Sequence, residues 1–167
     1  MIHNTKELVD IQEKFLDMEV KSFGREVIEF IDESASAFHV VKNCSDILEE
    51  NNFLRLMPQE KWKLKKGGKY FFKKSSSTII AFTVGENIDI KKGFKIFGAH
   101  TDSPCFKIKP NPEMITENIL RLNTEVYGGP ILNTWFDRPL SVAGRIIVKG
   151  KNIFSPKTIK VKIYKPI

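Results

Sequence analysis

The sequence lacks several features that would place it in a specialised class of protein. It has only two cysteines, Cys44 and Cys105, and no CxxC pair, which excludes a zinc ribbon and a thioredoxin-type redox motif. No apolar run approaches the roughly 20 residues that a membrane-spanning helix needs. Residues 1–21 alternate charged and apolar side chains and carry no signal-peptide core. We therefore expect a cytoplasmic protein with no membrane partner, in which both thiols are reduced.

Several short catalytic motifs are also absent. The chain has no Walker A or GxGxxG phosphate loop, no GxSxG nucleophile elbow and no HExxH zinc motif. What remains is ordinary globular composition: 167 residues, of which 41% are hydrophobic and 28% charged. This composition excludes a disordered tail, a collagen-like repeat and a disulfide miniprotein. The length fits one domain, or one domain and a piece of another.

Charge is distributed unevenly along the chain. The net charge is −7 over residues 1–60, +6 over 61–137 and +8 over 138–167, where acidic residues are absent. The densest basic cluster is interleaved with aromatic residues and comprises Lys61, Lys63, Lys65, Lys66, Lys69, Lys73 and Lys74. A solvated lysine face on a hairpin is the simpler interpretation. The alternative is a basic, non-enzymatic module that binds nucleic acid or another polyanion, but no RNP, KH, zinc-finger or basic-zipper pattern supports it.

The hydrophobic pattern predicts helices followed by strands. Apolar residues recur at helical spacing over residues 5–33 and again from Ser36, a candidate N-cap, to about Asn51. Strands are expected where Phe, Ile, Val and Thr concentrate between Gly and Pro, at residues 69–74, 78–84, 94–99, 106–109, 119–126, 143–148 and 158–164. The segment 94–99 is predicted to be buried because it is apolar except for Lys95. Prolines at 110 and 112 are expected to end the strand at 106–109.

Candidate chemistry concentrates directly after segment 94–99, at His100 and Asp102. Ligands of open α/β sheets lie at the carboxyl ends of strands. In a His-x-Asp pair, one imidazole nitrogen binds a metal while the other donates its hydrogen to the carboxylate, which fixes the tautomer of the ligand. A surface turn capped by the aspartate is the alternative. One ligand is not a site, since zinc needs three or four, and His39 is interpreted as a packed or capping histidine.

Four stretches, in matching order and spacing, resemble the M18 metallopeptidase family, the aspartyl aminopeptidase group. They are SASAFHVV at 34–41, GGKYFF at 67–72, GAHTDSPC at 98–105, and VYGG at 126–129 followed by NTWFDRPL at 133–140 and AGR at 143–145. The resemblance extends over about residues 23–164. The departures are small: Ala35 and Ala37 stand where proline is usual, and Pro130 stands where a third glycine is common.

This resemblance implies an α/β fold in which N-terminal helices pack on the mixed β-sheet of a zinc-exopeptidase catalytic domain. Residues 1–142 would be the N-terminal part of that domain, and residues 143–167 would begin an inserted dimerisation domain. Family members are cytosolic enzymes with two zinc ions that release N-terminal residues from peptides, and several members prefer acidic ones. They form dimer-based homo-oligomers of up to a dodecamer. By matched position, His100 would be a zinc ligand and Asp102 the carboxylate that orients it.

The resemblance covers only the N-terminal portion of a family member. In family sequences the bridging aspartate, the glutamate base and the other ligands come later than the position of Ile167. We therefore expect this chain to be an incomplete fragment, inactive alone. Asp137 resembles the bridging aspartate of a related peptidase family, but M18-like sequences carry that residue later, so it is interpreted as structural or near the pocket. The sequence leaves open whether Tyr127 and Trp135 line a pocket or a subunit contact.

Overall fold

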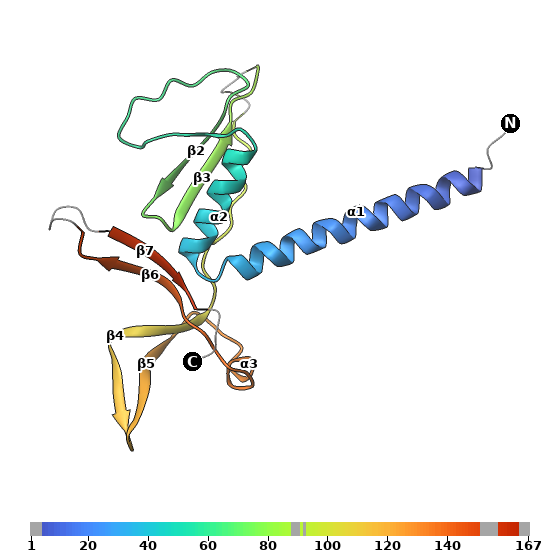
Figure 1. The fold of residues 1–167 in the computed structure, drawn as a ribbon. Helices are drawn as coiled ribbons and strands as arrows, with labels where there is room; N and C mark the ends of the chain where they lie inside the picture. The colour runs from blue at the N-terminus through green and yellow to red at the C-terminus, as the bar shows by residue number, and fades with distance from the viewer. Residues whose placement is uncertain (1–4, 88–90, 92, 151–156, 164–167) are drawn as a thin grey trace.

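The computed structural model describes residues 5–87, 91, 93–150 and 157–163. Its elements are, in chain order, α1 (Thr5–Glu33), α2 (Ala37–Glu50), β1 (Leu54–Arg55), β2 (Lys69–Lys74), β3 (Thr78–Thr83), β4 (Cys105–Thr116), β5 (Ile119–Tyr127), α3 (Asn133–Phe136), β6 (Ala143–Val148) and β7 (Lys157–Lys162). Figure 1 shows α2 beside the β2–β3 pair, with α1 extending away from the rest of the chain. In this described part, no helix is long and apolar enough to cross a membrane.

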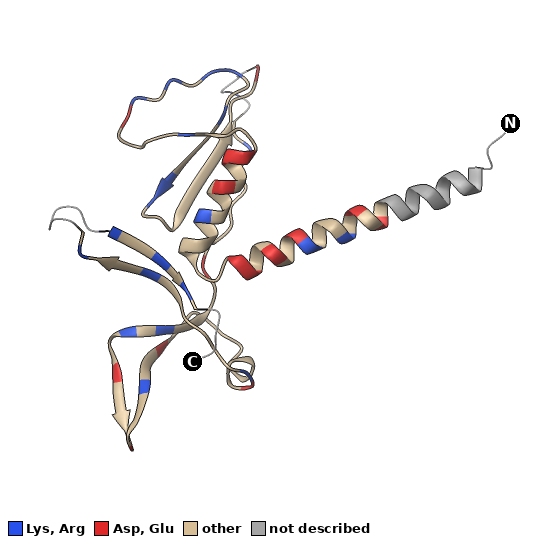
Figure 2. Ribbon diagram, in the orientation of Figure 1, with Lys and Arg blue, Asp and Glu red and all other residues tan. Residues whose placement is uncertain are grey.

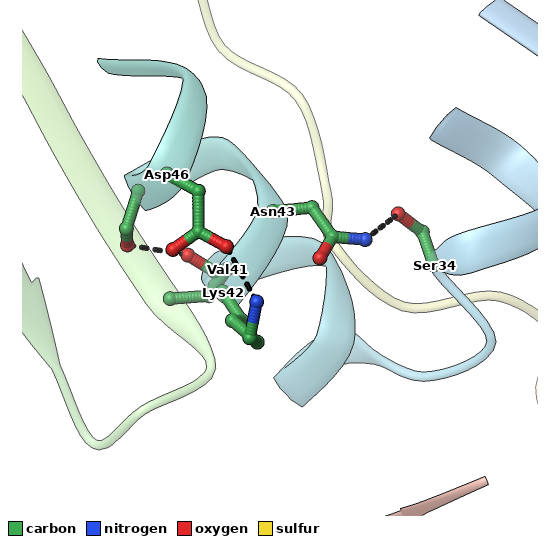
Figure 3. Close-up of polar contacts among 6 residues, drawn as sticks. Ser34, Val41, Lys42, Asn43 and Asp46 are labelled. Atoms are coloured by element: carbon green, nitrogen blue, oxygen red, sulfur yellow. Dashed lines mark hydrogen bonds and ion pairs between the residues drawn. The ribbon is translucent and has the colours of Figure 1, made fainter. Parts of the chain in front are cut away.

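The two long helices begin and end close to where the sequence predicts. Ser36 has the extended backbone of an N-cap residue (φ −153°, ψ 163°), and α2 ends at Glu50. Asn43 on α2 donates to the Ser34 hydroxyl at 3.1 Å, which fixes the corner between the helices, and Lys42 pairs with Asp46 one turn later (Figure 3). Helix α2 packs against β2, β3 and β6, whereas α1 makes its contacts chiefly with α2 and, at its last two residues, with Lys162 of β7. The expectation that both N-terminal helices cover a sheet is therefore wrong for α1.

The strands form three small sheets, where the sequence predicts one mixed sheet. In the first, β1 runs parallel to β2, and β2 runs antiparallel to β3. The other two are antiparallel hairpins, β4–β5 and β6–β7. The mixed α/β class is confirmed, but the prediction of a single sheet is wrong for the described residues.

The apolar core lies between α2 and β2. Phe71 and Val41 are buried there, and Phe71 is 0% exposed. Tyr70 is also buried, but on the opposite face of β2, where its ring centroid lies 5.6 Å from that of Phe82. On the other side of the same strand pair, the ring centroid of Trp62 lies 5.1 Å from that of Phe72 and 6.2 Å from that of Phe82. The aromatic residues of the lysine-rich segment therefore pack among themselves.

The prediction of a buried strand at residues 94–99 is wrong. This segment forms no strand in the described part of the chain, and the side chains of Phe94 and Phe97 are 85% and 96% exposed. A near-continuous apolar run is typical of a strand covered on both faces. The apolar composition of 94–99 is therefore suited to a strand with neighbours on both faces. None of the described strands pairs with this segment or covers it.

Strand β4 continues well beyond the end that the sequence predicts. It runs through Pro110 and Pro112 to Thr116, because its register against β5 shifts between Ile108 and Glu113. At such an irregularity a residue can lie outside the ladder, so a proline without an N–H is tolerated there. The other strand predictions agree with the structure to within two residues, except that Tyr164 lies outside the described residues.

Basic residues of the β6–β7 hairpin contact the segment where α1 ends and α2 begins. Figure 2 shows acidic residues on α1 and α2 and basic residues on β6 and β7. The Lys162 ammonium lies 3.3 Å from a carboxylate oxygen of Glu33 and also donates to the Asp32 carbonyl. The Arg145 guanidinium lies 4.4 Å from the centre of the Phe38 ring. The β6–β7 hairpin is thereby held against the start of α2.

Removing the central aromatic ring should destabilise the chain strongly. Phe71→Ala deletes a fully buried ring and should lower the free energy of unfolding by about 3–5 kcal/mol. Phe97→Ala makes the same chemical change at a side chain that is 96% exposed and should change stability by less than about 0.5 kcal/mol. Urea denaturation of both variants measures the difference, and equal losses would contradict the position of the core.

Stability should also depend on the ionisation of His39. This residue is buried on α2, with Nδ1 2.8 Å from the Ser36 hydroxyl oxygen. Burial first, and then Lys160, Lys162 and Lys42, lower the pKa of His39 below its ordinary value of 6.5, while Glu33 opposes them.

Because the pKa of His39 is lower in the folded chain, the unfolded chain binds the proton first as the pH falls. The free energy of unfolding should therefore decrease as the pH drops below about 6.5. His39→Gln should flatten this dependence, measured by urea denaturation at about pH 7.5 and about pH 5.5. The control, His100→Gln at an exposed histidine, should retain it. An unchanged slope in His39→Gln would refute this assignment.

Candidate functional site

The hairpin β4–β5 brings two distant segments together around a small cavity. Strand β4 begins at Cys105, immediately after the loop that carries His100, and Cys105 pairs with Tyr127 at the end of β5. This register places residues 127–128 beside residues 100–104. The resulting cavity is open, has a volume of about 300 Å³ and is lined by His100, Asp102, Ser103, Pro104, Tyr127 and Gly128.

His100 directs its Nδ1 atom toward Asp102. This nitrogen lies 2.6 Å from the backbone carbonyl oxygen of Asp102 and 3.4 Å from its carboxylate Oδ1. Since a carbonyl oxygen can only accept a hydrogen bond, Nδ1 carries the hydrogen and Nε2 keeps its lone pair. The side chain is 80% exposed, so the imidazole is accessible. The sequence predicts the carboxylate as the partner, whereas the nearer acceptor is the carbonyl of the same residue.

The Asp102 carboxylate has a second partner, Tyr127. The phenolic hydroxyl donates to Oδ2 of Asp102 over 2.6 Å. This hydrogen bond, followed by a backbone hydrogen bond and by His100, lowers the pKa of Asp102, and the same bond raises the pKa of Tyr127. Near neutral pH the carboxylate is therefore ionised and the phenol protonated. This hydrogen bond is absent from the sequence-based expectations, which leave the role of Tyr127 open.

Two further contacts hold the loop in place. The Thr101 hydroxyl donates to the carbonyl of Ser77, in the turn between β2 and β3, at 2.8 Å. On the other side, Gly128 has a φ of +74°, and a Cβ at this position would lie 3.4 Å from Cα and Cβ of Pro104. A contact of that length is ordinary van der Waals packing, so it is the left-handed backbone that favours glycine here. The loop thus contacts the β2–β3 turn through Thr101 and the residue that follows β5 through Pro104.

The other residues named from the sequence near this site have structural partners. The Trp135 ring packs edge-on against Phe106, with 5.3 Å between ring centroids. Asp137 accepts a hydrogen bond from Nε of the neighbouring Arg138 at 2.9 Å. Burial raises the pKa of the half-buried Cys105 thiol, which favours a packed thiol over a metal-binding thiolate. None of these three side chains lines the cavity.

The ligands for a complete zinc site are not assembled here. In the described ranges 5–87, 91, 93–150 and 157–163, no group of three or more His, Cys, Asp and Glu side chains is placed to hold a metal ion. His100 fits the part of one ligand by its tautomer and exposure. His39 is buried on α2, next to Ser36, and it does not line the cavity that contains His100. A zinc ion needs three or four protein ligands, so the described residues do not by themselves supply a zinc site.

Comparison with known proteins identifies the family. Residues 30–167 match the family described as "Aminopeptidase I zinc metalloprotease (M18)". The chain therefore belongs to the M18 family of aminopeptidases, and the resemblance of its four motifs to that family is confirmed.

Individual relatives agree with this assignment. The chain is 56% identical over 146 residues to a probable M18 family aminopeptidase 2 of Clostridium acetobutylicum, a match that covers 87% of this chain and 34% of the relative. It is 42% identical over 145 residues to an aspartyl aminopeptidase of Dictyostelium discoideum, covering 86% and 30%. Its fold matches the S. cerevisiae mApe1 dodecamer structure with a TM-score of 0.79 and 29% identity, covering 87% and 34%. The chain spans about a third of the length of these proteins.

The left-handed backbone at Gly128 yields a matched test of the site's backbone. Gly128→Ala places an alanine at a φ of +74° and should lower the free energy of unfolding by about 1–2 kcal/mol. Gly129→Ala adds the same methyl group where the backbone is not left-handed and no atom lies within 4 Å, and it should change stability by less than about 0.5 kcal/mol. Urea denaturation separates the two. Equal losses of stability in the two variants would contradict a left-handed backbone at residue 128.

Proposed function

We propose that this chain is the N-terminal portion of a zinc-dependent aminopeptidase and that His100 is one of its zinc ligands. The observation that carries the proposal is the geometry of the imidazole within the M18-matching region. Its Nδ1 hydrogen faces Asp102, which leaves the lone pair of Nε2 available. Ligating histidines typically donate their second nitrogen to a carbonyl or carboxylate in this manner.

In this proposal Asp102 orients the ligand. Its carbonyl accepts from Nδ1 at 2.6 Å, and its ionised carboxylate lies at 3.4 Å, where it favours the polarised imidazole of a metal ligand. When bound, zinc lowers the pKa of a water molecule and polarises a peptide carbonyl. We assign the remaining ligands, the second zinc ion and the general base to the part of the longer relatives that this chain does not cover.

The names of the relatives support finer expectations. The name of the Dictyostelium discoideum relative, aspartyl aminopeptidase, supports the proposal that this protein removes acidic N-terminal residues from peptides. The dodecameric yeast structure supports the proposal that this protein forms a dimer-based homo-oligomer. We further propose that residues 143–167 begin the dimerisation domain, which is consistent with β6 and β7 forming a sheet of their own. The cytoplasmic location stays a prediction.

The alternative function, binding of a polyanion, loses its main support. Single-stranded nucleic acids are bound by exposed aromatic rings that stack on bases beside basic residues. Here Trp62 packs against Phe72 and Phe82, and its indole nitrogen donates to the Met57 carbonyl at 2.9 Å. Tyr70 is buried. The lysines are therefore best explained as a solvated face.

The test begins with the native protein. Its intact mass under denaturing conditions determines which polypeptide to assay: 19.2 kDa corresponds to this chain, and a mass more than twice as large to a full-length relative. In the polypeptide so identified, His100→Ala should lower zinc affinity and peptide hydrolysis by more than about 100-fold, since loss of a ligand exceeds the effect of an outer-shell change. His39→Gln should leave both unchanged, because that residue is buried on α2.

Two outcomes would contradict the proposal. Full zinc content and full activity in His100→Ala would exclude this residue as a ligand. Residues 1–167 alone with added zinc should release no amino acids, and release at a rate typical of aminopeptidases would refute the need for further ligands. Binding of an anionic polymer that weakens steeply with salt would favour the alternative function.

A further inference from the structure

Tyr127 completes a chain of hydrogen-bonding groups that ends at His100. Its hydroxyl donates to Oδ2 of Asp102 at 2.6 Å, while Oδ1 of the same carboxylate lies 3.4 Å from Nδ1 of His100. Each carboxylate oxygen thus faces a different partner. We infer that Tyr127 is a positioning residue that holds Asp102, and through it His100, in the orientation of a metal ligand. This inference rests on the proposed function of His100.

Asp102 needs such a restraint because its own segment provides little. Residues 98–104 form no helix or strand, and the side chains of His100 and Asp102 are 80% and 45% exposed. An exposed carboxylate without a partner exchanges among several rotamers. Of the neighbouring contacts, the hydrogen bond from Thr101 to Ser77 fixes the backbone of the loop. It does not reach the carboxylate.

Tyr127, in contrast, lies at the end of a regular strand. It is the last residue of β5, and four consecutive pairs, from Cys105–Tyr127 to Ile108–Thr124, fix its register. The Lys107 ammonium lies 5.9 Å from the centre of its ring, within reach of a cation–π interaction. The next residue, Gly128, packs against Pro104. A strand positions a side chain more accurately than a loop does, so the tyrosine can define where the aspartate lies.

The chemistry of the pair suits this role. A phenol that donates to an ionised carboxylate forms a short, charge-assisted hydrogen bond, stronger than one between neutral groups. The hydrogen bond raises the pKa of Tyr127 and lowers that of Asp102, so the donor keeps its proton and the acceptor keeps its charge. Groups that orient a metal ligand from outside the first coordination shell typically contribute about 10–100-fold to metal affinity or activity.

The first test removes only the hydroxyl group. In the zinc-binding polypeptide, Tyr127→Phe should lower zinc affinity and kcat about 10–100-fold with little change in KM. The matched control is Tyr70→Phe, which deletes a hydroxyl that accepts from the backbone N–H of Lys65 at 2.9 Å, outside the cavity. It should leave zinc affinity unchanged. Because Tyr127 is 42% exposed, loss of one oxygen atom there is compatible with folding, which circular dichroism verifies.

The second test needs no metal and no activity. The chain contains three histidines, so long-range proton–nitrogen NMR spectra of the ¹⁵N-histidine-labelled chain resolve each imidazole, and His100→Gln assigns the relevant signals. The nitrogen shifts report which ring nitrogen carries the hydrogen. His100 should be the Nδ1–H tautomer in the unmodified chain and in Tyr70→Phe. Tyr127→Phe should increase the share of the Nε2–H tautomer, a change that a purely structural role would not produce.

The outcomes separate this inference from the proposed function. If Tyr127→Phe leaves the tautomer and the zinc affinity unchanged while His100→Ala abolishes zinc binding, the positioning role is overturned and the proposed function stands. If Tyr127→Phe changes the tautomer while His100→Ala retains zinc, the link between tyrosine, aspartate and histidine is supported and the role of His100 as a ligand is overturned. Loss of zinc in both variants, with the expected tautomer shift, supports both.

Discussion

The antiparallel register of β4 and β5 is the constraint on which the candidate site depends. It sets Cys105 opposite Tyr127, so that the loop entering β4 and the turn leaving β5 meet at one end of the hairpin. Side chains alternate between the two faces of a strand, so a slip of one residue would turn Tyr127 to the opposite face. Its hydroxyl would then lose Asp102, and the cavity would lose one wall. The site is therefore a product of long-range strand pairing as much as of the residues around His100.

The register shift in the β4–β5 hairpin lies away from the end of the hairpin that forms the site. The register shifts between Ile108 and Glu113, beyond the four pairs that begin at Cys105. Pro110 and Pro112 lie within the shifted region, where missing N–H donors do not interrupt the ladder next to the cavity. The proline pair that misleads sequence-based prediction of the strand end is thus separated from the residues that determine the position of Tyr127.

The sequence predicts elements better than it predicts their partners. Strands β2, β3 and β6 follow directly from β-branched and aromatic residues bounded by glycine, and His100 and Asp102 follow from a local motif. The hydrogen bond between Asp102 and Tyr127 spans 25 residues and depends on register, which no local pattern contains. The segment 94–99 shows the same limit in another form. Its apolar composition indicates a buried strand, but the composition does not specify which strands would cover it. The same reason explains why three small sheets are found where one was expected.

For His100 itself, strand pairing acts indirectly: it positions Tyr127, and side-chain hydrogen bonds then restrain the loop that carries the imidazole. The segment before it is exposed and unpaired. Two contacts then hold its neighbours: Thr101 to the β2–β3 turn, and Asp102 to Tyr127. Of these, the second restrains the carboxylate that lies 3.4 Å from the imidazole, and the first restrains the loop backbone. When few contacts restrain a ligand, each determines a larger share of its orientation, so one phenolic oxygen can have an effect on metal binding that its exposure alone would not suggest.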